Sequence, residues 1–531
     1  ITSFDPALGV VTMVPNSLGP GELITLYGTQ QQKDNYLPKL ANGTYIPCFG
    51  LTGPQNGSDA TGAIDTGKLV VDNDGKKYIE VTVNKRYITL APVANLIGLA
   101  FDLQDPDKLL ERGTPGITVA LIEKGSCGLL QNTYHNPLNV GFPNGTLKGN
   151  LRIPVENIIG GESNAGEGWK MLMECLAAGR GISLPATANA SSKVAAFGIH
   201  HYIQIRKQFK MSLSKMEAIQ QKYNNLLYNT WIIQSSVELT NTILDNGDKP
   251  AVLSAIMKQQ TTERARIVLN EAMDIHAGAS ICLGYSNFLE KFYRCAPVGI
   301  TVEGSNTLTR SLIIFGQGLN KSHPHIFEIL DSILKNDETL FDKHFKEILN
   351  HSIRLYVDSC ANIFRNDLQQ QIIHFACLTN FVALRGGALK KEQLLSGKMA
   401  DIFSNLYMAI SVQHYQNTYQ ASEKFTKYVI DRLLNENRGF INEVVDNLGV
   451  ERFTLCHLKR NVRSFKYDEE REVFKELMEN PKILTEIKKN IEIRGVLKCM
   501  EEAVNLDISS DEYKALEEKI INVGEYALSD L

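Results

Sequence analysis

Glu303 is the residue whose type and surroundings best suit acid–base chemistry. It stands in the run Val302-Glu303-Gly304-Ser305-Asn306, between an apolar stretch and a predicted helix start. A carboxylate on a short loop that faces an apolar slot has a raised pKa, which suits a base for weakly acidic C–H bonds. The commoner role for this spacing is a first-turn carboxylate that interacts with the helix dipole, with Ser305 as the N-cap. The residues alone leave both interpretations open.

A second candidate is the loop Leu51-Thr-Gly-Pro-Gln-Asn-Gly-Ser-Asp-Ala60, which is dense in turn formers and directly follows the apolar run PCFGL. Its backbone N–H groups and the hydroxyls of Thr52 and Ser58 can hydrogen-bond the polar edge of a cofactor. From composition alone, an ordinary loop between two strands is the more common interpretation. The loop matches neither the G-x-G-x-x-G nor the Walker A pattern, so it does not indicate those nucleotide folds.

Two arginine-containing segments, Arg180 and the run Arg206-Lys-Gln-Phe209, lie on helices that the sequence predicts. Such arginines usually belong to a solvated face or a structural ion pair. The functional alternative is binding of a pyrophosphate or orientation of an active-site loop.

Length and composition describe a soluble globular chain of several domains. It has 531 residues, of which 43% are hydrophobic and 21% charged, and a formal net charge of −4, so no positive field recruits nucleic acid. The nine cysteines contain no C-x-x-C and the histidines no H-E-x-x-H, so the sequence predicts no metal site. No apolar run reaches the ~20 residues of a membrane-spanning helix, and residues 88–101 read as a pair of buried strands.

Hydrophobic periodicity predicts a mainly α, multidomain α+β fold with four parts. Residues 1–44 are expected to be helical, and 45–160 to form a middle domain of short strands. Residues 161–322 are expected to form a bundle of long helices (190–210, 215–246 and 250–275), followed after a break at Pro297, Gly299 and Gly304 by a helix at 306–317. Residues 323–531 are expected to form an additional, more charged helical domain.

Five stretches occur in the order LTGPQNGSDA, NKRYITLAP, IPVENIIGG with GEGW, RKQF and VEGSNTLTR. In these stretches the chain resembles the acyl-CoA dehydrogenase family. LRGGALKKEQLLSGKMADIFSNLYMA is similar to the large bacterial fatty-acid β-oxidation members that carry an extra C-terminal helical domain. The resemblance implies an N-terminal helical domain, a middle β-barrel-like domain and a four-helix bundle. It also implies FAD between barrel and bundle in a homodimer.

The resemblance implies a role for individual residues. Glu303 matches the catalytic base, and Arg310 completes its E-G-x-x-x-x-x-R motif. The residues implied to bind the cofactor are Phe49, Leu51, Thr52, Gly57, Ser58, Tyr87, Thr89, Arg206, Phe209, Asp274, Gly278, Ser305 and Thr307. Those implied to bind the substrate are Ser58, Arg180 and Gly304. The chain departs from the family pattern at Gly53, usually an acid, at Tyr87, usually a tryptophan, and at Asp274, usually a glutamine.

The implied reaction is FAD-dependent α,β-dehydrogenation of a medium- or long-chain fatty acyl-CoA to the trans-2-enoyl-CoA, with electrons passed to an electron-transferring flavoprotein. Two alternatives stay open. One is an acyl-CoA oxidase, in which oxygen is the acceptor, and the other is a non-catalytic helical scaffold of the same fold. The expected location is the bacterial cytoplasm, at the inner membrane periphery in a full-length protein.

The chain opens on the apolar run Ile1-Thr-Ser-Phe-Asp-Pro, without a methionine. Residues 1–44 match only the last part of the family's N-terminal helical domain. The sequence therefore predicts a fragment with exposed bundle surface, poor solubility and weak FAD retention, which an upstream segment would correct. Any membrane association would come only from that absent upstream segment.

Overall fold

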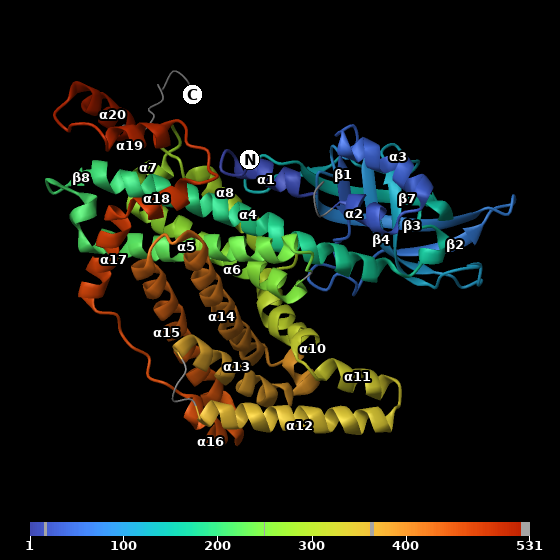
Figure 1. Cartoon of the computed structure of the whole chain (residues 1–531). Coiled ribbons are helices and arrows are strands. Elements are labelled where there is room, and N and C mark those ends of the chain that lie inside the picture. Colours follow the sequence, from blue (N-terminus) through green and yellow to red (C-terminus); the bar gives the residue numbers. More distant parts are fainter. Residues whose placement is uncertain (15–18, 249, 362–365, 522–531) are drawn as a thin grey trace. The chain divides into compact units, whose positions relative to one another are not determined.

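The structure, a computed structural model, describes residues 1–14, 19–248, 250–361 and 366–521 (Figure 1). Its described residues form two compact units, each built from two stretches of the chain. Unit 1 contains residues 1–187 and 294–304, and unit 2 contains residues 188–293 and 305–531. The four-domain division expected from the sequence is a finer one and stays a prediction.

Unit 1 begins with three helices, as the sequence predicts for residues 1–44: α1 (Pro6–Met13), α2 (Pro20–Tyr27) and α3 (Gln30–Ala41). Asp5 caps α1, since its carboxylate accepts a hydrogen bond of 2.8 Å from the N–H of Ala7. Thr29 and Gln32 form a capping box at the start of α3, in which each side chain accepts from the other's backbone N–H. These caps satisfy donors that would otherwise be unpaired at the helix starts.

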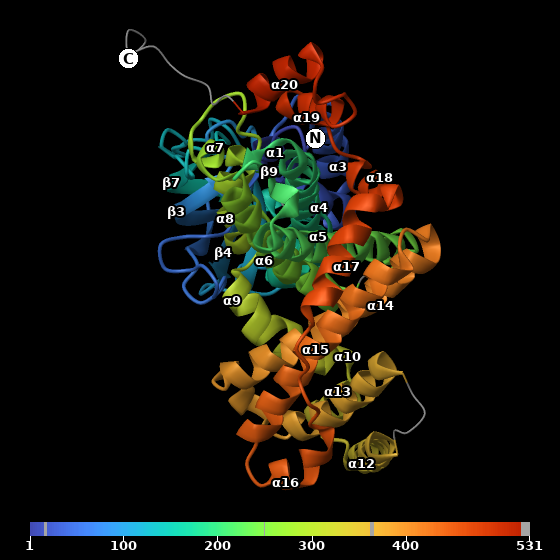
Figure 2. The ribbon, with the colours of Figure 1, turned by 90° about the vertical axis from the view of Figure 1, so that its left-hand side faces the viewer.

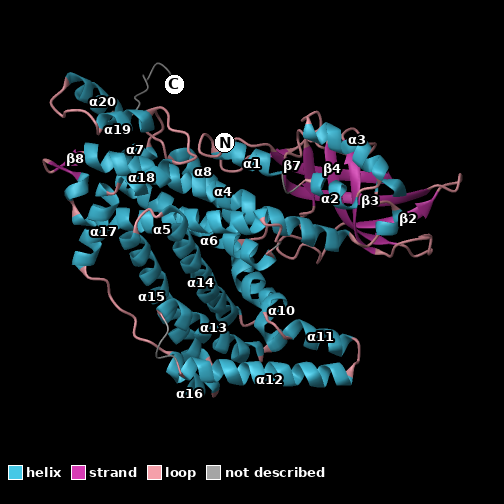
Figure 3. Ribbon diagram, viewed as in Figure 1, coloured by secondary structure: helices cyan, strands magenta, loops and turns pink. Residues whose placement is uncertain are grey.

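A seven-stranded mixed sheet follows (Figure 3). Its strands are β1 (Pro47–Gly50), β2 (Thr66–Val71), β3 (Lys77–Thr89), β4 (Leu96–Gln104), β5 (Gly116–Glu123), β6 (Tyr134–His135) and β7 (Asn144–Pro154). The path is β1-β4-β2-β3-β7-β6, and β5 pairs with β4. The predicted all-β region is thus confirmed, including the strand pair at 88–101, where β3 ends and β4 begins. On β3, Ile79, Val81 and Val83 alternate with exposed residues and enter the sheet core.

Two helices contribute to both units. They are α4 (Gly168–Ile205) and α8 (Glu290–Thr301). The sequence predicts a break at Pro297, Gly299 and Gly304. α8 runs through the first two residues, and the break lies at residues 302–305, which include Gly304. A proline inside a helix removes one hydrogen bond and crowds the carbonyl of the preceding turn, and the core contacts of α8 offset this cost. In unit 1, Cys295 of α8 and Leu184 of α4 share a core with Val10 and Met13 of α1.

Unit 2 contains the rest of the predicted bundle. Its elements are β8 (Lys207–Gln208), β9 (Met211–Ser212), α5 (Glu217–Asp245), α6 (Ala251–His276), α7 (Gly278–Ile281), α9 (Asn306–Leu308), η5 (Thr309–Gln317) and α10 (Gly318–Ser322). Of these, η5 is a π-helix, where the sequence predicts an ordinary helix at 306–317. Short 3-10 turns in the two units are η2 (Val155–Asn157), η3 (Glu162–Asn164), η4 (Leu213–Lys215), η6 (Gly386–Lys390) and η7 (Cys456–Leu458).

The additional C-terminal helices also belong to unit 2. They are α11 (Ile326–Leu334), α12 (Glu338–Cys360), α13 (Asp367–Ala383), α14 (Gln393–Tyr419), α15 (Glu423–Asn447), α16 (Glu451–Leu455), α17 (Tyr467–Glu479), α18 (Pro481–Lys488), α19 (Val496–Ala503) and α20 (Asp511–Ile521). Figures 1 and 2 show α14 and α15 side by side, and α14 also packs against α5 and η5. None of the helices within the described ranges is long and apolar enough to cross a membrane.

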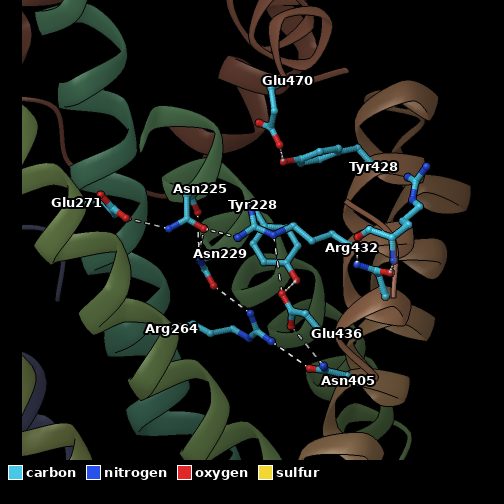
Figure 4. Close-up of polar contacts among 12 residues, drawn as sticks. Asn225, Tyr228, Asn229, Arg264, Glu271, Asn405, Tyr428, Arg432, Glu436 and Glu470 are labelled. Atoms are coloured by element: carbon cyan, nitrogen blue, oxygen red, sulfur yellow. Dashed lines mark hydrogen bonds and ion pairs between the residues drawn. The ribbon is translucent and has the colours of Figure 1, made fainter. Parts of the chain in front are cut away.

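A polar network joins the additional helices to the bundle helices within unit 2 (Figure 4). The guanidinium of Arg264 on α6 donates to Asn405 on α14 at 3.1 Å, and the hydroxyl of Tyr228 on α5 donates to Glu436 on α15 at 3.0 Å. Tyr428 on α15 donates to Glu470 on α17 at 2.8 Å. Such buried pairing fixes the register between helices, because each partner left alone would be costly in this environment.

Candidate active site

Glu303 lies in unit 1 in a backbone conformation that side-chain-bearing residues rarely adopt. It follows the end of α8 and has φ +58°, and the next residue, Gly304, has φ +91°. Both carboxylate oxygens of Glu303 are shielded from solvent. Left-handed backbone at a residue other than glycine costs about 1 kcal/mol or more and tends to persist at functional sites.

The helix that begins after Glu303 tests whether this carboxylate is a first-turn residue that interacts with the helix dipole. Ser305 is the N-cap of α9, as expected, because its hydroxyl accepts a 3.3 Å hydrogen bond from the N–H of Leu308. Glu303 lies two positions before this N-cap, so it is outside the first turn of α9. The carboxylate is therefore not a first-turn residue of that helix.

Arg180 is the charged partner of Glu303 within unit 1. It lies on α4, as predicted, and burial lowers the pKa of its guanidinium while the negative charge of Glu303 raises it. A cation beside a carboxylate favours the ionised form of that carboxylate, which is the form that accepts a proton. The structure thus brings together two of the residues expected from the sequence, a base and an arginine.

The loop at 51–60 is held in a defined shape by Asn56, which is almost fully buried. The side-chain amide of Asn56 donates to the carbonyl oxygens of Leu51 at 3.0 Å and Ala60 at 2.9 Å. The N–H of Gly53 donates to the carbonyl of Asn56 at 3.1 Å. A Cβ on Gly53 would lie 2.7 Å from Asn56 Oδ1, so the packing accounts for glycine at this position. Gly57 and Ser58 lie on the exposed side of the loop.

Phe49 and Leu51 lead into this loop from β1. Both pack against the core that Leu23, Ile24 and Leu96 form. The ring of Phe49 covers Gly98 on the neighbouring strand β4, where a Cβ would approach the ring to 2.7 Å. These two residues position the loop from its apolar side, and the backbone of Thr52 connects it to β3, because its carbonyl accepts from the N–H of Arg86 at 3.0 Å.

Tyr87 is displayed by a β-bulge next to that loop. The pairing of β3 with β7 shifts register between Lys85 and Ile88, and Tyr87 within the shift has φ +60°. A bulge re-aims a side chain away from the regular alternation of a strand, and the ring of Tyr87 is 57% exposed. The amide of Asn144 fixes the far side of the bulge, donating to the carbonyl of Tyr87 at 3.1 Å and to the hydroxyl of Thr89 at 3.4 Å.

The surroundings of Tyr87 fit an aromatic cofactor with hydrogen-bonding edges. The guanidinium of Arg86 lies 4.8 Å from the centre of the Tyr87 ring, and the ring of His135 lies 5.0 Å away, tilted by 54°. Among the described residues, neither Arg86 Nε nor His135 Nε2 has a hydrogen-bond partner, although both atoms are shielded. Shielded polar atoms of this kind need a partner, and the edge of a flavin ring carries both donors and acceptors. The side chains present here therefore fit the FAD that the resemblance implies.

Arg206 and Phe209 occupy a β-hairpin in unit 2, so their predicted location on a bundle helix was wrong. α4 ends at Ile205, and the strands β8 and β9 pair on either side of Phe209 and Lys210. These two residues have φ +52° and +63°, the left-handed conformation of a two-residue turn that usually carries Asn-Gly. Phe209 at the tip is 87% exposed.

The remaining predicted cofactor residues also lie in unit 2. Asp274 on α6 is ion-paired with Lys222 of α5 at 2.7 Å. Gly278 begins α7, and no heavy atom of the described residues lies within 4 Å of where its Cβ would be. Thr307 is exposed on α9, two residues after the N-cap Ser305.

Two anchors next to the Glu303 loop were not found from the sequence. Asn306 accepts a 2.7 Å hydrogen bond from the fully buried Lys258, and Arg310 forms a two-pronged ion pair with Asp401. Arg310 was visible as a motif residue, but no local signal identifies a partner 91 positions further along the chain. In the residues that the structure describes, no group of three or more His, Cys, Asp or Glu side chains is arranged to hold a metal ion.

Comparison with known families gives matches along much of the chain. Residues 166–316 match the model described as acyl-CoA dehydrogenase, C-terminal domain. Residues 360–520 match the model described as acyl-CoA dehydrogenase, C-terminal, bacterial type. The second match covers most of the helices that the sequence analysis assigned to an additional domain.

Individual relatives agree with these matches. The chain is 29% identical over 294 residues to acryloyl-CoA reductase (NADH) of Anaerotignum propionicum, covering 55% of this chain and 71% of the relative. It is 28% identical over 328 residues to a probable acyl-CoA dehydrogenase of Mycobacterium tuberculosis, covering 59% of this chain. The matched region spans about half of that mycobacterial relative, 48% of its length.

Solved structures share the fold. An acyl-CoA dehydrogenase complexed with FAD from Bacillus anthracis aligns with a TM-score of 0.71 at 21% identity, covering 89% of this chain and 82% of that one. Butyryl-CoA dehydrogenase from Megasphaera elsdenii aligns with a TM-score of 0.52 at 25% identity, covering 60% and 79%. With both family models in chain order and the fold shared along most of its length, this chain belongs to the acyl-CoA dehydrogenase family.

Proposed function

We propose that the protein is a flavin-dependent acyl-CoA dehydrogenase in which Glu303 removes the proton on the carbon next to the thioester carbonyl. The observation that carries this proposal is the state of Glu303, a shielded carboxylate held in left-handed backbone opposite the charge of Arg180. A structural carboxylate has no need of that backbone strain. A base that must meet a C–H bond at one fixed position does.

The chain's own residues divide the work of the reaction. Glu303 accepts the proton, and its backbone N–H donates to the thioester oxygen on which negative charge develops, as the family resemblance implies. Arg180 keeps the carboxylate ionised before the proton arrives. Tyr87, Thr52 and Ser58 hold the cofactor, and FAD, when bound, supplies the acceptor for the hydrogen that leaves the neighbouring carbon with its electron pair.

We further propose that the enzyme acts as a homodimer in which Phe209 and Arg206 contact the FAD of the partner subunit. The exposed ring of Phe209 and its strained turn support this, because an isolated chain gains nothing from either. A guanidinium close to a pyrophosphate would contribute binding through paired hydrogen bonds. Loss of Arg206 is therefore expected to lower FAD content rather than to change proton transfer.

We propose medium- or long-chain fatty acyl-CoA as the substrate and an electron-transferring flavoprotein as the acceptor. The resemblance to the β-oxidation members supports both assignments. A relative named acryloyl-CoA reductase favours a second candidate, reduction of a 2-enoyl-CoA. That reaction uses the same base and cofactor in reverse, so the direction depends on the redox partner. An oxidase would be distinguished from both by rapid hydrogen peroxide formation without a protein acceptor.

The test is anaerobic addition of an acyl-CoA series to the FAD-loaded protein, followed by the loss of flavin absorbance. Glu303→Gln should keep its FAD and its melting temperature but reduce the flavin at least ~10²-fold more slowly, because an amide cannot accept the proton. Glu479→Gln, which removes an exposed carboxylate, is the matched control and should behave as wild type. Bleaching of Glu303→Gln at the wild-type rate would refute the assignment of the base.

A further inference from the structure

The helix that follows the Glu303 loop has an unusual geometry. η5 is a π-helix of nine residues, Thr309–Gln317, and only the three residues of α9 separate it from the N-cap Ser305. π-Helical geometry is rare and usually limited to single turns, often at functional sites, because it packs less well than an α-helix. A run of this length needs contacts from outside to hold it.

η5 contacts several elements of unit 2, among them α6 and α14, and α14 belongs to the additional C-terminal helices. Arg310 donates from Nε to Asp401 Oδ1 at 2.7 Å and from Nη2 to Asp401 Oδ2 at 2.5 Å. This fork-to-fork pairing is among the strongest and most directional side-chain contacts, and it raises the pKa of Arg310. Five residues earlier on α14, the hydroxyl of Ser396 donates to the backbone carbonyl of Ser311 at 2.5 Å. Both the side chain and the backbone of η5 are therefore fixed by α14.

The face of α14 that contacts η5 also contacts the bundle helix α6. Gly397, Asp401 and Asn405 are spaced four residues apart, so they lie above one another on one side of the helix. Asn405 accepts from Arg264 of α6 at 3.1 Å, as Figure 4 shows. Gly397 leaves room for the fork, because a Cβ there would lie 2.6 Å from Arg310 Nη1. The face thus connects η5 to a core helix of the bundle.

The start of the same segment is held by α6 directly. The side chain of Asn306 accepts from Lys258 Nζ at 2.7 Å and donates to Thr262 Oγ1 at 2.9 Å and to Glu263 Oε1 at 2.9 Å. Asn306 and Lys258 are both buried. Residues 306–311, which directly follow the Glu303 loop in the chain, are therefore fixed by α6 at one end and by α14 at the other.

We propose that Asp401, through Arg310, is a positioning residue for the Glu303 loop, which gives the additional C-terminal domain a part in catalysis. The inference rests on the proposed role of Glu303 as the base. Without the fork, η5 is free to return to α-helical winding, which has fewer residues per turn. Because only Gly304, Ser305 and α9 separate Glu303 from η5 in the chain, rewinding of η5 changes the backbone direction at the end of the loop, and with it the left-handed conformation that orients the Glu303 side chain.

The experiment compares two substitutions that each remove one arginine–aspartate pair from the same unit. Asp401→Asn removes the charge that receives Arg310. Asp367→Asn is the matched control, because Asp367 pairs with Arg438 at 2.7 Å between α13 and α15, two helices that do not include η5. In the FAD-loaded protein, Asp401→Asn should slow flavin reduction by acyl-CoA about tenfold or more and shift the pH dependence of that rate, with KM nearly unchanged. Asp367→Asn should lower the melting temperature without either kinetic effect.

A second variant separates an effect on catalysis from a loss of folding. Gly397→Ala keeps the charge of Asp401 and favours the helix, since alanine is the better helix former by about 1 kcal/mol. Its added Cβ displaces the end of Arg310, so it should slow flavin reduction severalfold while the melting temperature holds or rises. If Asp401→Asn and Gly397→Ala reduce the flavin at the rate of Asp367→Asn, Asp401 has no positioning role. That result is separate from the test of the base, because Glu303→Gln can still abolish reduction in the same assay.

Discussion

Arg180 on α4 and Glu303 after α8 interact electrostatically although they are 123 positions apart in the chain. The two elements that bring them together are the two helices that unit 1 shares with unit 2. A buried guanidinium and a shielded carboxylate stabilise each other's charges, since neither has full access to water. The chemistry proposed for Glu303 therefore depends on the charge of Arg180.

Replacement of Arg180 by methionine removes that positive charge and keeps an apolar stem of similar length. The carboxylate then ionises less readily, so the acid limb of the pH–rate profile for flavin reduction should move to higher pH by about one unit or more. Arg180→Lys keeps the charge and should move the limb much less. Stopped-flow reduction rates between pH 5.5 and 9 measure the shift, and an unchanged profile in Arg180→Met would contradict the coupling.

Gly53 is expected to resist replacement by the acid that the family resemblance implies at this position. In Gly53→Asp the new Cβ would lie 2.7 Å from Asn56 Oδ1 and 3.0 Å from the carbonyl oxygen of Asn84. The side chain of Asn56 must move, and its hydrogen bonds to Leu51 and Ala60 are then lost, at about 1 kcal/mol each. FAD content after dialysis should fall, whereas Gly387→Ala in η6, where the added Cβ meets open space and which is not among the cofactor residues, should retain FAD. Full FAD retention in Gly53→Asp would show that the loop adapts.

The hairpin turn at Phe209-Lys210 is expected to lower the stability of the fold and to strengthen the binding of FAD. The double substitution Phe209→Asn, Lys210→Gly installs the residues that this turn prefers and relieves about 1 kcal/mol or more of backbone strain at each position. The melting temperature of the FAD-free protein should rise, while FAD retention falls because the exposed ring is gone. Lys210→Gly alone relieves strain and keeps the ring, so it should raise stability without loss of FAD. Unchanged FAD retention in the double variant would remove the proposed role of Phe209.

His276 should make unit 2 less stable in mild acid. The ring packs between Tyr202 and Phe288, with centroids 4.5 and 4.9 Å away, and burial lowers its pKa to about 4. Since the folded-state pKa lies below the ordinary value of 6.5, the unfolded chain binds more protons between about pH 4 and 6.5. The free energy of unfolding therefore falls as the pH falls through this window, by roughly 2 kcal/mol from this group between pH 7 and 5.

The measurement is urea unfolding of wild type and His276→Leu at pH 7 and pH 5. The leucine variant should lose roughly 2 kcal/mol less than wild type between the two values. His414→Leu, a partly exposed control on α14, should keep the wild-type difference. Equal losses in wild type and His276→Leu would mean that protonation of this ring is not what destabilises the fold.

Sequence patterns predicted the elements well where a local signal determines them. The alternation of apolar residues in β3 located the sheet in the sequence, and the long amphipathic stretches of α5 and α6 located the bundle. Ser305 is the N-cap that its residue type suggests. Two local expectations were wrong. The helix break expected at Pro297 and Gly299 is absent, although the one at Gly304 occurs. The run at Arg206 forms a hairpin in place of the expected helix, because tertiary packing outweighs the propensities of single residues.

The details of the site depended on partners far away in the sequence. The bulge that displays Tyr87 arises from a register shift against β7, about 57 residues further along the chain. The π-helical winding of η5 and the fork between Arg310 and Asp401 depend on α14. Family resemblance identified these residues without the contacts that give them their geometry, since a motif records residue types and not their partners.

The return of the chain to unit 1 at residues 294–304 has a consequence for synthesis on the ribosome. Val10 and Met13 share their core with Cys295, Val298 and Val302, so this core stays incomplete while residues 188–293 are being made. At ~5–20 residues per second this delay lasts about 5 to 20 s. During that time the apolar side of α1 is available to chaperones and to neighbouring nascent chains.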